Sequence, residues 1–306
     1  MKNRSKSLSY LKYTLKIFLF TFIFSCSSNT KKEIEEWEQL FNGKNLENWI
    51  IKFANQNLNY NYKNTFRVQD SMIRVMYDKY DQFENSYAHL FYKQPFSYYK
   101  LKFDYRFLGN QAKGGAVWNK RNSGVMLHSQ SPESTDFGQY FPVSIEIQLL
   151  GGLGESKRNT GNLCTPGTAV VIDNQINYTH CINSKSKTYH GDQWVSAEVI
   201  VYGHEQITHI IENDTVLKYY KPQIGGGFSQ PQLGDDDWSS NGIDSKNYWL
   251  SKEGELMDSG YIALQAESHP IDFKNIKLLN LCGCMDKKAK NFKSYFIKEN
   301  NSKCIY

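Results

Sequence analysis

The 306-residue chain lacks several features that would point to common classes of protein. Its longest apolar run near the N-terminus, residues 17–24, is too short to cross a bilayer as a helix. It has 6 cysteines but no C-x-x-C pair, which argues against a zinc site. The net charge is +5, yet no basic run is interleaved with aromatic residues. We therefore expect no nucleic-acid partner.

The N-terminus has the pattern of an export signal. Five basic residues within positions 2–16 precede the apolar run, which ends at Ser25-Cys26-Ser27. A short apolar segment followed by a small residue and cysteine looks like a bacterial lipobox. We expect residues 1–26 to be a lipoprotein signal peptide, with Cys26 lipidated and residues 27–37 as a tether. The protein would then be exported and membrane-anchored at the cell envelope. The alternatives are an ordinary secretory signal with an incidental cysteine, or a buried apolar segment.

The remaining cysteines fit an oxidising compartment. Cys164 and Cys181 flank an Asp-Asn turn signal, so a hairpin could bring them together. Cys284 and Cys304 could close a small terminal loop. This leaves Cys282 unpaired. A zinc site is the competing interpretation, but no suitable ligand spacing supports it.

Short alternating apolar and polar runs, separated by turn residues, dominate the chain after residue 37. Period-two alternation favours strands with one buried face, and many such strands predict an all-β sandwich or jelly roll. Only residues 31–41 have a pattern compatible with a short helix. The runs are residues 65–76, 98–107, 124–129, 143–150, 194–202, 207–212, 216–220, 261–266 and 273–281.

Two long segments, 108–122 and 221–247, are rich in glycine and predict loops that are either functional or mobile. The first carries Trp118. We interpret the acidic run 235–237 in the second as a solvated turn, since its spacing matches no calcium loop. Residues 282–306 are Lys- and Asn-rich and too few for their own core without a staple, so we expect a disulfide-closed appendix.

Four segments together resemble one known family. They are FNGKNLENW (41–49), NSGVMLHS (122–129), EIQLLGG (146–152) and GYIALQAESHPIDFKNIKLLNL (260–281). Their order and spacing are similar to those of the 3-keto-disaccharide hydrolases, in the concanavalin A-like lectin/glucanase superfamily, over residues 38–281. The resemblance implies a jelly-roll sandwich with a sugar site on its concave sheet. One departure matters, because many members have Arg where this chain has His128. The tail also resembles small Cys-bounded C-terminal modules of secreted proteins.

Candidate site residues follow from strand alternation. Glu146 and Gln148 share one face of their strand, opposite the apolar residues. His128 lies on the NSGV strand and would stand near Glu146 if the two strands are adjacent. Gln265 and Glu267 share a face of a third strand. We expect these side chains to line one cleft. The alternative is a solvated outer face without function.

The carboxylates suggest which reaction such a cleft would run. A retaining glycosidase needs two carboxylates about 5 Å apart, and Glu146 has no acidic neighbour on its own strand face, although Glu267 could contribute from another strand. A 3-keto sugar relaxes that demand, because its ketone acidifies the C2 proton. Glu146 is then the expected base, with His128 and Gln148 stabilising the enolate.

Further contacts to the sugar are expected from Asn122, Trp118 and His190, together with Gln148, Gln265 and Glu267. The expected partner is a carbohydrate substrate or glycan. No cofactor is indicated, although a divalent metal would be compatible with enolate chemistry. The competing hypothesis is a non-catalytic carbohydrate-binding surface lipoprotein, because one sandwich fold can host either role.

Overall fold

The computed structural model describes residues 34–154, 156–228 and 235–306. The predicted signal peptide, its lipidation site Cys26 and most of the tether lie outside these residues. In the part of the chain that is described, no helix combines the length and apolar character needed to span a bilayer.

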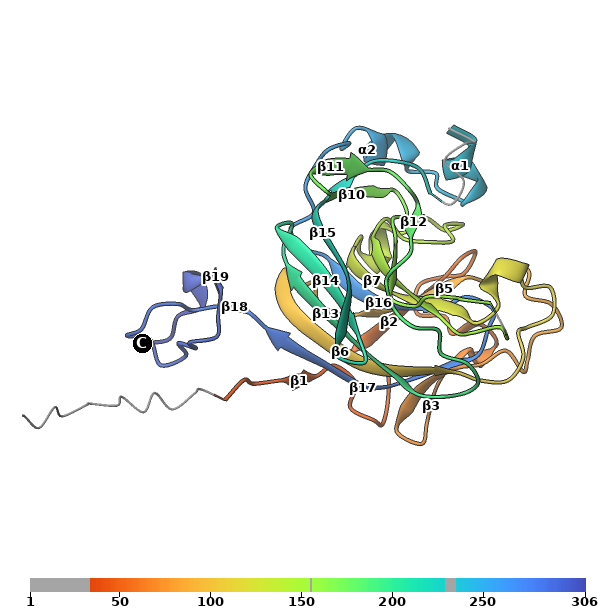
Figure 1. Cartoon of the computed structure of the whole chain (residues 1–306), viewed down its shortest axis with the longest axis horizontal. Helices are drawn as coiled ribbons and strands as arrows, with labels where there is room; N and C mark the ends of the chain where they lie inside the picture. The colour runs from red at the N-terminus through yellow and green to blue at the C-terminus, as the bar shows by residue number, and fades with distance from the viewer. Residues whose placement is uncertain (1–33, 155, 229–234) are drawn as a thin grey trace, which may run out of the picture. The chain divides into compact units, whose positions relative to one another are not determined.

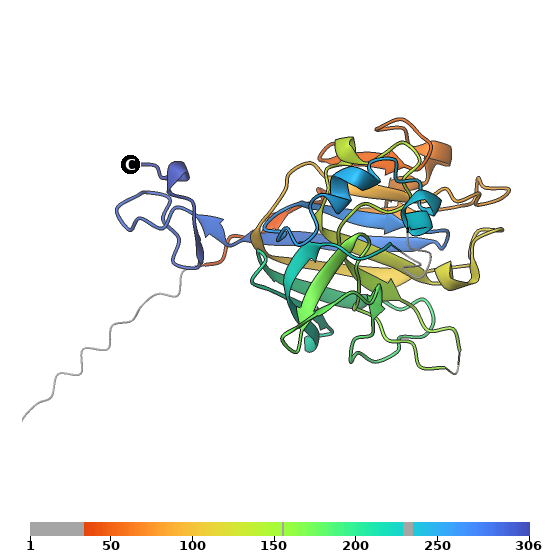
Figure 2. The same ribbon diagram turned by 90° about the horizontal axis from the view of Figure 1, so that it is seen from above.

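Two antiparallel sheets face each other and form a β-sandwich (Figures 1 and 2). The larger sheet has ten strands among the described residues, in the order β11-β10-β15-β14-β13-β6-β17-β4-β3 with β1 beside β17. These strands are β1 (Glu38–Gln39), β3 (Phe66–Gln69), β4 (Met72–Val75), β6 (Tyr98–Phe107), β10 (Thr168–Ile172), β11 (Gln175–Asn177), β13 (Val195–Tyr202), β14 (Gln206–Ile211), β15 (Asp214–Ile224) and β17 (Ile271–Asn280).

The smaller sheet has seven strands among the described residues, in the order β12-β9-β8-β7-β16-β5-β2. They are β2 (Trp49–Phe53), β5 (Ala88–Tyr92), β7 (Asn122–Ser129), β8 (Ile145–Leu150), β9 (Asn162–Cys164), β12 (Cys181–Ile182) and β16 (Tyr261–Ala266). Short helices α1 (Asp235–Ser240) and α2 (Lys246–Leu250) lie between β15 and β16. The protein therefore has the expected all-β, jelly-roll architecture of the concanavalin A-like class.

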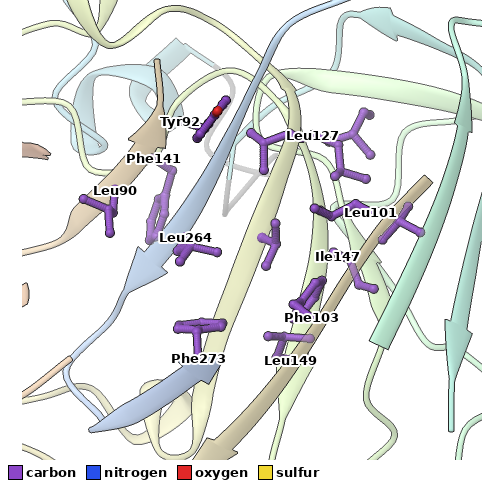
Figure 3. Close-up of a cluster of buried hydrophobic side chains, with 14 of the residues drawn as sticks. Leu90, Tyr92, Leu101, Phe103, Leu127, Phe141, Ile147, Leu149, Leu264 and Phe273 are labelled. Carbon is purple, nitrogen blue, oxygen red and sulfur yellow. The ribbon is translucent and has the colours of Figure 1, made fainter. Parts of the chain in front are cut away.

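The core fills the space between the two sheets (Figure 3). Leu101 and Phe103 of β6 face inward from the larger sheet, and Ile147, Leu149 and Leu264 face them from the smaller one. All five are at most 1 % exposed. Apolar residues at every second position form this layer because successive side chains of a strand point to opposite faces.

The smaller sheet is buried on its outer face as well. Every residue of β7 is buried, whereas β6 alternates between buried and half-buried positions. Phe141, in the loop between β7 and β8, contacts the ring of Tyr87, just before β5, and the ring of His89 within β5. Polar side chains on this outer face therefore have restricted access to water and must find partners there.

Most predicted strands are confirmed, and three local expectations are wrong. Residues 34–37 have no regular structure and Glu38–Gln39 is a strand, so the described part of the expected helix is extended. The run 65–76 is a hairpin rather than one strand, because Asp70 and Ser71 adopt positive φ and turn the chain. The acidic run is the start of α1, with Asp237 fully buried and accepting a hydrogen bond from the Phe228 amide.

Both expected disulfides form, between Cys164 and Cys181 and between Cys284 and Cys304. The first joins neighbouring strands β9 and β12, and the Asp-Asn turn lies between β10 and β11 as expected. Cys282 is free. After the sandwich, β18 (Cys282–Gly283) lies just before the loop that the second disulfide closes, and it pairs in parallel with β19 (Lys298–Glu299) within that loop.

Candidate functional site

The outer face of the smaller sheet carries a row of polar side chains. Strands β7, β8 and β9 are adjacent, with Met126 opposite Glu146, Gly124 opposite Gln148, and Gln148 opposite Asn162. Glu146 and Gln148 project away from the core because their neighbours on β8 face inward. The NSGV and EIQLL strands are therefore adjacent, which is the condition on which a position of His128 near Glu146 depends.

The row continues across β16 and β5. Leu264 pairs with Val125, which puts Gln265 beside Gly124, and Gln265 pairs with His89 of β5. Both side chains are almost fully buried, and neither Gln265 Oε1 nor His89 Nε2 has a hydrogen-bond partner. Burial lowers the pKa of His89 to about 3, so its ring is neutral at physiological pH.

Glu146 and Glu267 form a pair of buried carboxyl groups on this face. Glu146 is 7 % exposed and Glu267 3 %. Burial raises the pKa of Glu146 to about 8, and burial together with the Glu146 charge raises the pKa of Glu267 well above its usual range. The second carboxylate that is missing from the strand of Glu146 is therefore supplied by the end of β16.

Gly124 makes room for the Glu146 carboxylate. A Cβ atom at Gly124 would lie 2.1 Å from Glu146 Oε1, so any larger residue would displace the acid. The Glu146 side chain therefore lies across β7, toward the strand that carries Gln265. Glycine in this strand serves close packing of a functional side chain, a recognised reason for glycine inside a sheet.

Arg158 places a positive charge near Glu267 and partly offsets the rise of its pKa. Its guanidinium is held by three backbone carbonyls, because Nη1 donates to the oxygens of Lys120, Arg121 and Gly151 at 2.7, 3.1 and 2.8 Å. The charge is consequently fixed in position rather than carried by a mobile side chain. Sequence reasoning missed Arg158, which lies in a loop without alternation or a motif.

Several polar atoms on and beside this face are buried and have no partner in the protein. Most buried polar atoms in folded proteins are hydrogen-bonded, because an unpaired one costs about 1–3 kcal/mol. Five of the unpaired atoms among the described residues lie on and beside this face. They are His89 Nε2, Asn119 Oδ1, Asn122 Oδ1, Gln265 Oε1 and Glu267 Oε2.

An aromatic group lies next to these polar atoms. Tyr87, two residues before His89, contacts Trp118, Tyr140 and Phe141. The Trp118 ring stacks on Tyr87 with centroids 6.3 Å apart and stays 53 % exposed. Burial raises the pKa of Tyr87, and the nearby Glu267 charge adds to this rise. An exposed indole beside buried hydrogen-bonding groups is suited to the face of a sugar ring.

His128 does not share this face, contrary to the expectation from alternation. Its φ is +47°, and the β7–β16 register shifts between Ala263 and Tyr261. This irregularity turns the imidazole toward the other sheet, where Nε2 donates to the Gly203 carbonyl at 3.1 Å in the β13–β14 turn. His128 is therefore remote from the Gln265 row, and His89 is the histidine that the fold brings there.

His190 is exposed, and its ring packs against Gly152, just beyond the end of β8. A Cβ at Gly152 would meet His190 Nδ1 at 2.3 Å. No contact of His190 with the buried carboxyl groups is seen. Asn122, by contrast, begins β7 on the face of the polar row.

Three potential metal ligands also lie close together, namely Cys164, His180 and Cys181, with ligand atoms within 4.8 Å of one another. Both sulfur atoms are joined in the disulfide. The cluster therefore offers no thiolate in this state, and zinc would require its reduction.

A two-sheet antiparallel sandwich with a polar, partly aromatic site on its smaller sheet belongs to the lectin/glucanase class of folds. The model of the 3-keto-alpha-glucoside-1,2-lyase-like domain matches residues 36–279, and the chain belongs to this family. The resemblance carried by the four sequence segments is confirmed. The family indicates a carbohydrate-active domain similar to glycosyl hydrolases.

Solved structures with similar architecture include two candidate glycosyl hydrolases from Parabacteroides distasonis. They are 19 % and 18 % identical, cover 80 % of this chain and 100 % and 94 % of their own, and give TM-scores of 0.45 and 0.46. A carbohydrate-binding module from Bacillus subtilis is 8 % identical, covers 76 % of this chain and 96 % of its own, and gives 0.40. No curated protein matches the chain. The function is therefore inferred from the residues of this chain and its family.

Proposed function

We propose that the protein cleaves 3-keto-disaccharides or related 3-keto-glycosides by elimination and hydration, with Glu146 as the base. The observation that carries the proposal is the pair of buried carboxyl groups with raised pKa values. An ordinary retaining glycosidase needs one carboxylate that stays ionised at low pH as nucleophile and one protonated acid. Here the pKa values of Glu146 and Glu267 are both raised above the usual range of a carboxyl group.

A base whose pKa is near 8 suits removal of a carbon-bound proton. Glu146 takes the C2 proton, and the electrons of the broken C–H bond form an enolate with the C3 ketone. The enolate collapses to a C1–C2 double bond as the C1–O bond breaks. Glu267, which is protonated, donates a proton to the departing oxygen. Addition of water across the double bond, with OH to C1 and H to C2, completes hydrolysis.

The surrounding residues bind the sugar and stabilise the negative charge that develops on it. Asn162 donates to Gln148 Oε1 at 3.1 Å, which leaves the Gln148 Nε2 amide as a donor for the developing enolate oxygen. Gln265 Oε1 and Asn122 Oδ1 are acceptors for sugar hydroxyls. The fixed Arg158 cation adds positive charge near Glu267, and Trp118 offers an apolar face for the ring.

The test compares a 3-keto-disaccharide with its parent disaccharide, using wild type and Glu146→Gln. We expect release of monosaccharide from the keto substrate only, a primary isotope effect with deuterium at C2, and at least a hundredfold loss in the variant, in the range of general-base catalysis. Glu198→Gln is the matched control, because Glu198 pairs with Lys102 on the other sheet at 3.2 Å.

Three results would overturn parts of the proposal. Equal cleavage of the parent disaccharide would indicate an ordinary glycosidase. Full turnover by Glu146→Gln would exclude this base. Sugar binding without cleavage by the wild type would favour the non-catalytic binding protein instead.

We further propose that Cys26 carries the lipid that anchors the exported chain to the cell envelope. The support is the order of segments in the leader, in which basic residues are followed by an apolar run and then by Ser-Cys. Mass spectrometry of the N-terminal peptide is expected to show an acylated Cys26, and Cys26→Ser should release the protein from membranes. An unmodified peptide that still begins at the leader would contradict this.

A further inference from the structure

Arg158 keeps one edge of its guanidinium open beside the carboxyl pair. Its Nη1 atom donates to three backbone carbonyls, so both hydrogens of that nitrogen are engaged. Nε and Nη2 have no hydrogen-bond partner among the described residues, and neither atom is fully enclosed by the protein. The parallel N–H groups of this edge form a planar fork, which matches the two oxygens of a carboxylate.

The positive charge of Arg158 is also unmatched. Among the described residues, no carboxylate forms an ion pair with it. Burial lowers the pKa of Arg158, and the nearby Glu267 opposes this effect. The raised pKa of Glu267 keeps its carboxyl group protonated at neutral pH, so this residue does not neutralise the guanidinium. A partly buried cation without a counter-ion is costly, which favours a ligand that brings a negative charge.

Two further cations lie in the same region. Burial lowers the pKa of His269 to about 4, and the charges of Arg121, Lys120 and Arg158 lower it too, whereas Asp192 acts in the opposite sense. Arg121 pairs with Asp192 at 2.5 Å, which cancels one charge of each sign. Lys120 is exposed and has no ion-pair partner among the described residues. The described charges around His269 therefore leave an excess of two positive charges.

These cations adjoin the aromatic surface expected to take the sugar. Trp118 lies in the short 3-10 helix Val117–Asn119, and Asn119 Nδ2 donates to the Tyr87 hydroxyl at 3.0 Å. Lys120 follows directly, and its carbonyl accepts the hydrogen bond from Arg158. Two residues span at most about 7 Å of chain, so the guanidinium is held close to the indole.

We propose that the sugar processed at the carboxyl site is a uronic acid, whose carboxylate binds the Nε–Nη2 edge of Arg158 while its ring stacks on Trp118. The inference rests on the proposed function for the position of the sugar, but not on the elimination chemistry. A sulfate ester would present similar oxygens, so the test includes one.

The first experiment measures binding to the wild type by isothermal titration calorimetry at low salt. Methyl β-D-glucuronide and methyl β-D-glucoside differ only at C6, where the first has a carboxylate and the second a hydroxymethyl group. We expect the glucuronide to bind about tenfold more tightly, in line with one charge-assisted bidentate contact, and this preference to fall as salt is added. Methyl β-D-glucoside 6-sulfate is the second anion, and tighter binding of this ester would overturn the choice of a carboxylate.

The variants separate recognition of the anion from support of the loop. Arg158→Gln should bring the ratio of the two affinities close to one and leave glucoside binding unchanged within about twofold. A merely structural role would instead weaken both ligands equally. Arg158→Lys keeps a charge without the fork and should give an intermediate ratio. Arg67→Gln is the matched control, because Arg67 pairs with Asp78 beside the other sheet.

Lys120→Gln guards against misfolding of the Arg158 variants. Only the backbone oxygen of Lys120 contacts Arg158, so the variant is expected to fold normally and to lower the affinity ratio about twofold. Far-UV circular dichroism is the check on all variants.

Equal binding of the glucuronide and the glucoside by the wild type would overturn the proposal, as would an unchanged ratio in folded Arg158→Gln. These results are distinct from failure of the proposed function. A wild type that prefers the glucuronide but cleaves no 3-keto-glycoside would leave the uronic acid site standing without that chemistry. Cleavage of a neutral 3-keto-disaccharide without any preference for the glucuronide would do the reverse.

Discussion

Replacement of Glu146 by Gln is expected to stabilise the protein and flatten its dependence on pH. Burial raises the pKa of Glu146 to about 8, against 4.5 for the unperturbed group. Between these values the unfolded chain has released the proton and the folded chain keeps it. Raising the pH in this window therefore favours unfolding, and the wild type loses stability as the pH rises.

The size of the effect follows from the window. From 4.5 to about 8 the interval is about 3.5 pH units, and each unit corresponds to 1.36 kcal/mol, which gives at most about 5 kcal/mol at pH 8. Below pH 4.5 both states are protonated, so the variant and the wild type should be similarly stable. Glu267 adds to the wild-type slope, because burial and, to a smaller extent, the Glu146 charge raise its pKa.

The assay is urea unfolding at a series of pH values from 4 to about 8.5, followed by tryptophan fluorescence and circular dichroism. Glu198→Gln controls for loss of one negative charge, since that residue is paired on the other sheet. Parallel pH profiles for wild type and Glu146→Gln would refute the idea that Glu146 is buried as a proton-binding group. A variant less stable than wild type at pH 8 would refute it as well.

Three further predictions concern other parts of the fold. Gly124→Ala should lower kcat on a 3-keto-disaccharide by about a hundredfold in steady-state assays, because its Cβ would displace Glu146, whereas unchanged turnover would show that the acid needs no such placement. Removing the first disulfide with Cys164→Ser and Cys181→Ser should lower the free energy of unfolding by about 3 kcal/mol, given a sequence separation of 17, and an unchanged urea midpoint would contradict this. Asp272→Ala should cost about 3 kcal/mol in the same measurement, because Asp272 is fully buried between two arginines that would lose their partner, and a loss under 1 kcal/mol would contradict the pairing.

The sandwich itself was predictable because its signal is local. β6 buries every second residue over ten positions, and the Asp-Asn turn with flanking cysteines marks the hairpin near the first disulfide. The errors arose where a few residues change the chain direction. Asp70 and Ser71 convert one apparent strand into two, and nothing in the alternation reveals this.

The candidate site was only partly predictable, because alternation is a local signal and the site joins residues from distant parts of the chain. Alternation along β8 identifies Glu146 and Gln148, but it says nothing about which side chains on neighbouring strands reach them. Glu267 is 121 positions later in the chain, and the β7–β16 pairing brings it close enough for the Glu146 charge to act on it. His89 had a weak signal, as a polar residue inside an apolar run, and Arg158 had none.

One strand explains both the success and the failure of face assignment. At one end of β7, Gly124 follows the regular pleat and makes room for the Glu146 carboxylate. At the other end, the positive φ of His128 breaks the period-two rule, and one irregular residue sends the side chain to the opposite side of the sheet. A non-glycine residue in that conformation costs energy, which the hydrogen bond to Gly203 and the fully buried surroundings offset. The strain is therefore maintained at the end of β7, where alternation alone would have put a catalytic group that the fold does not provide.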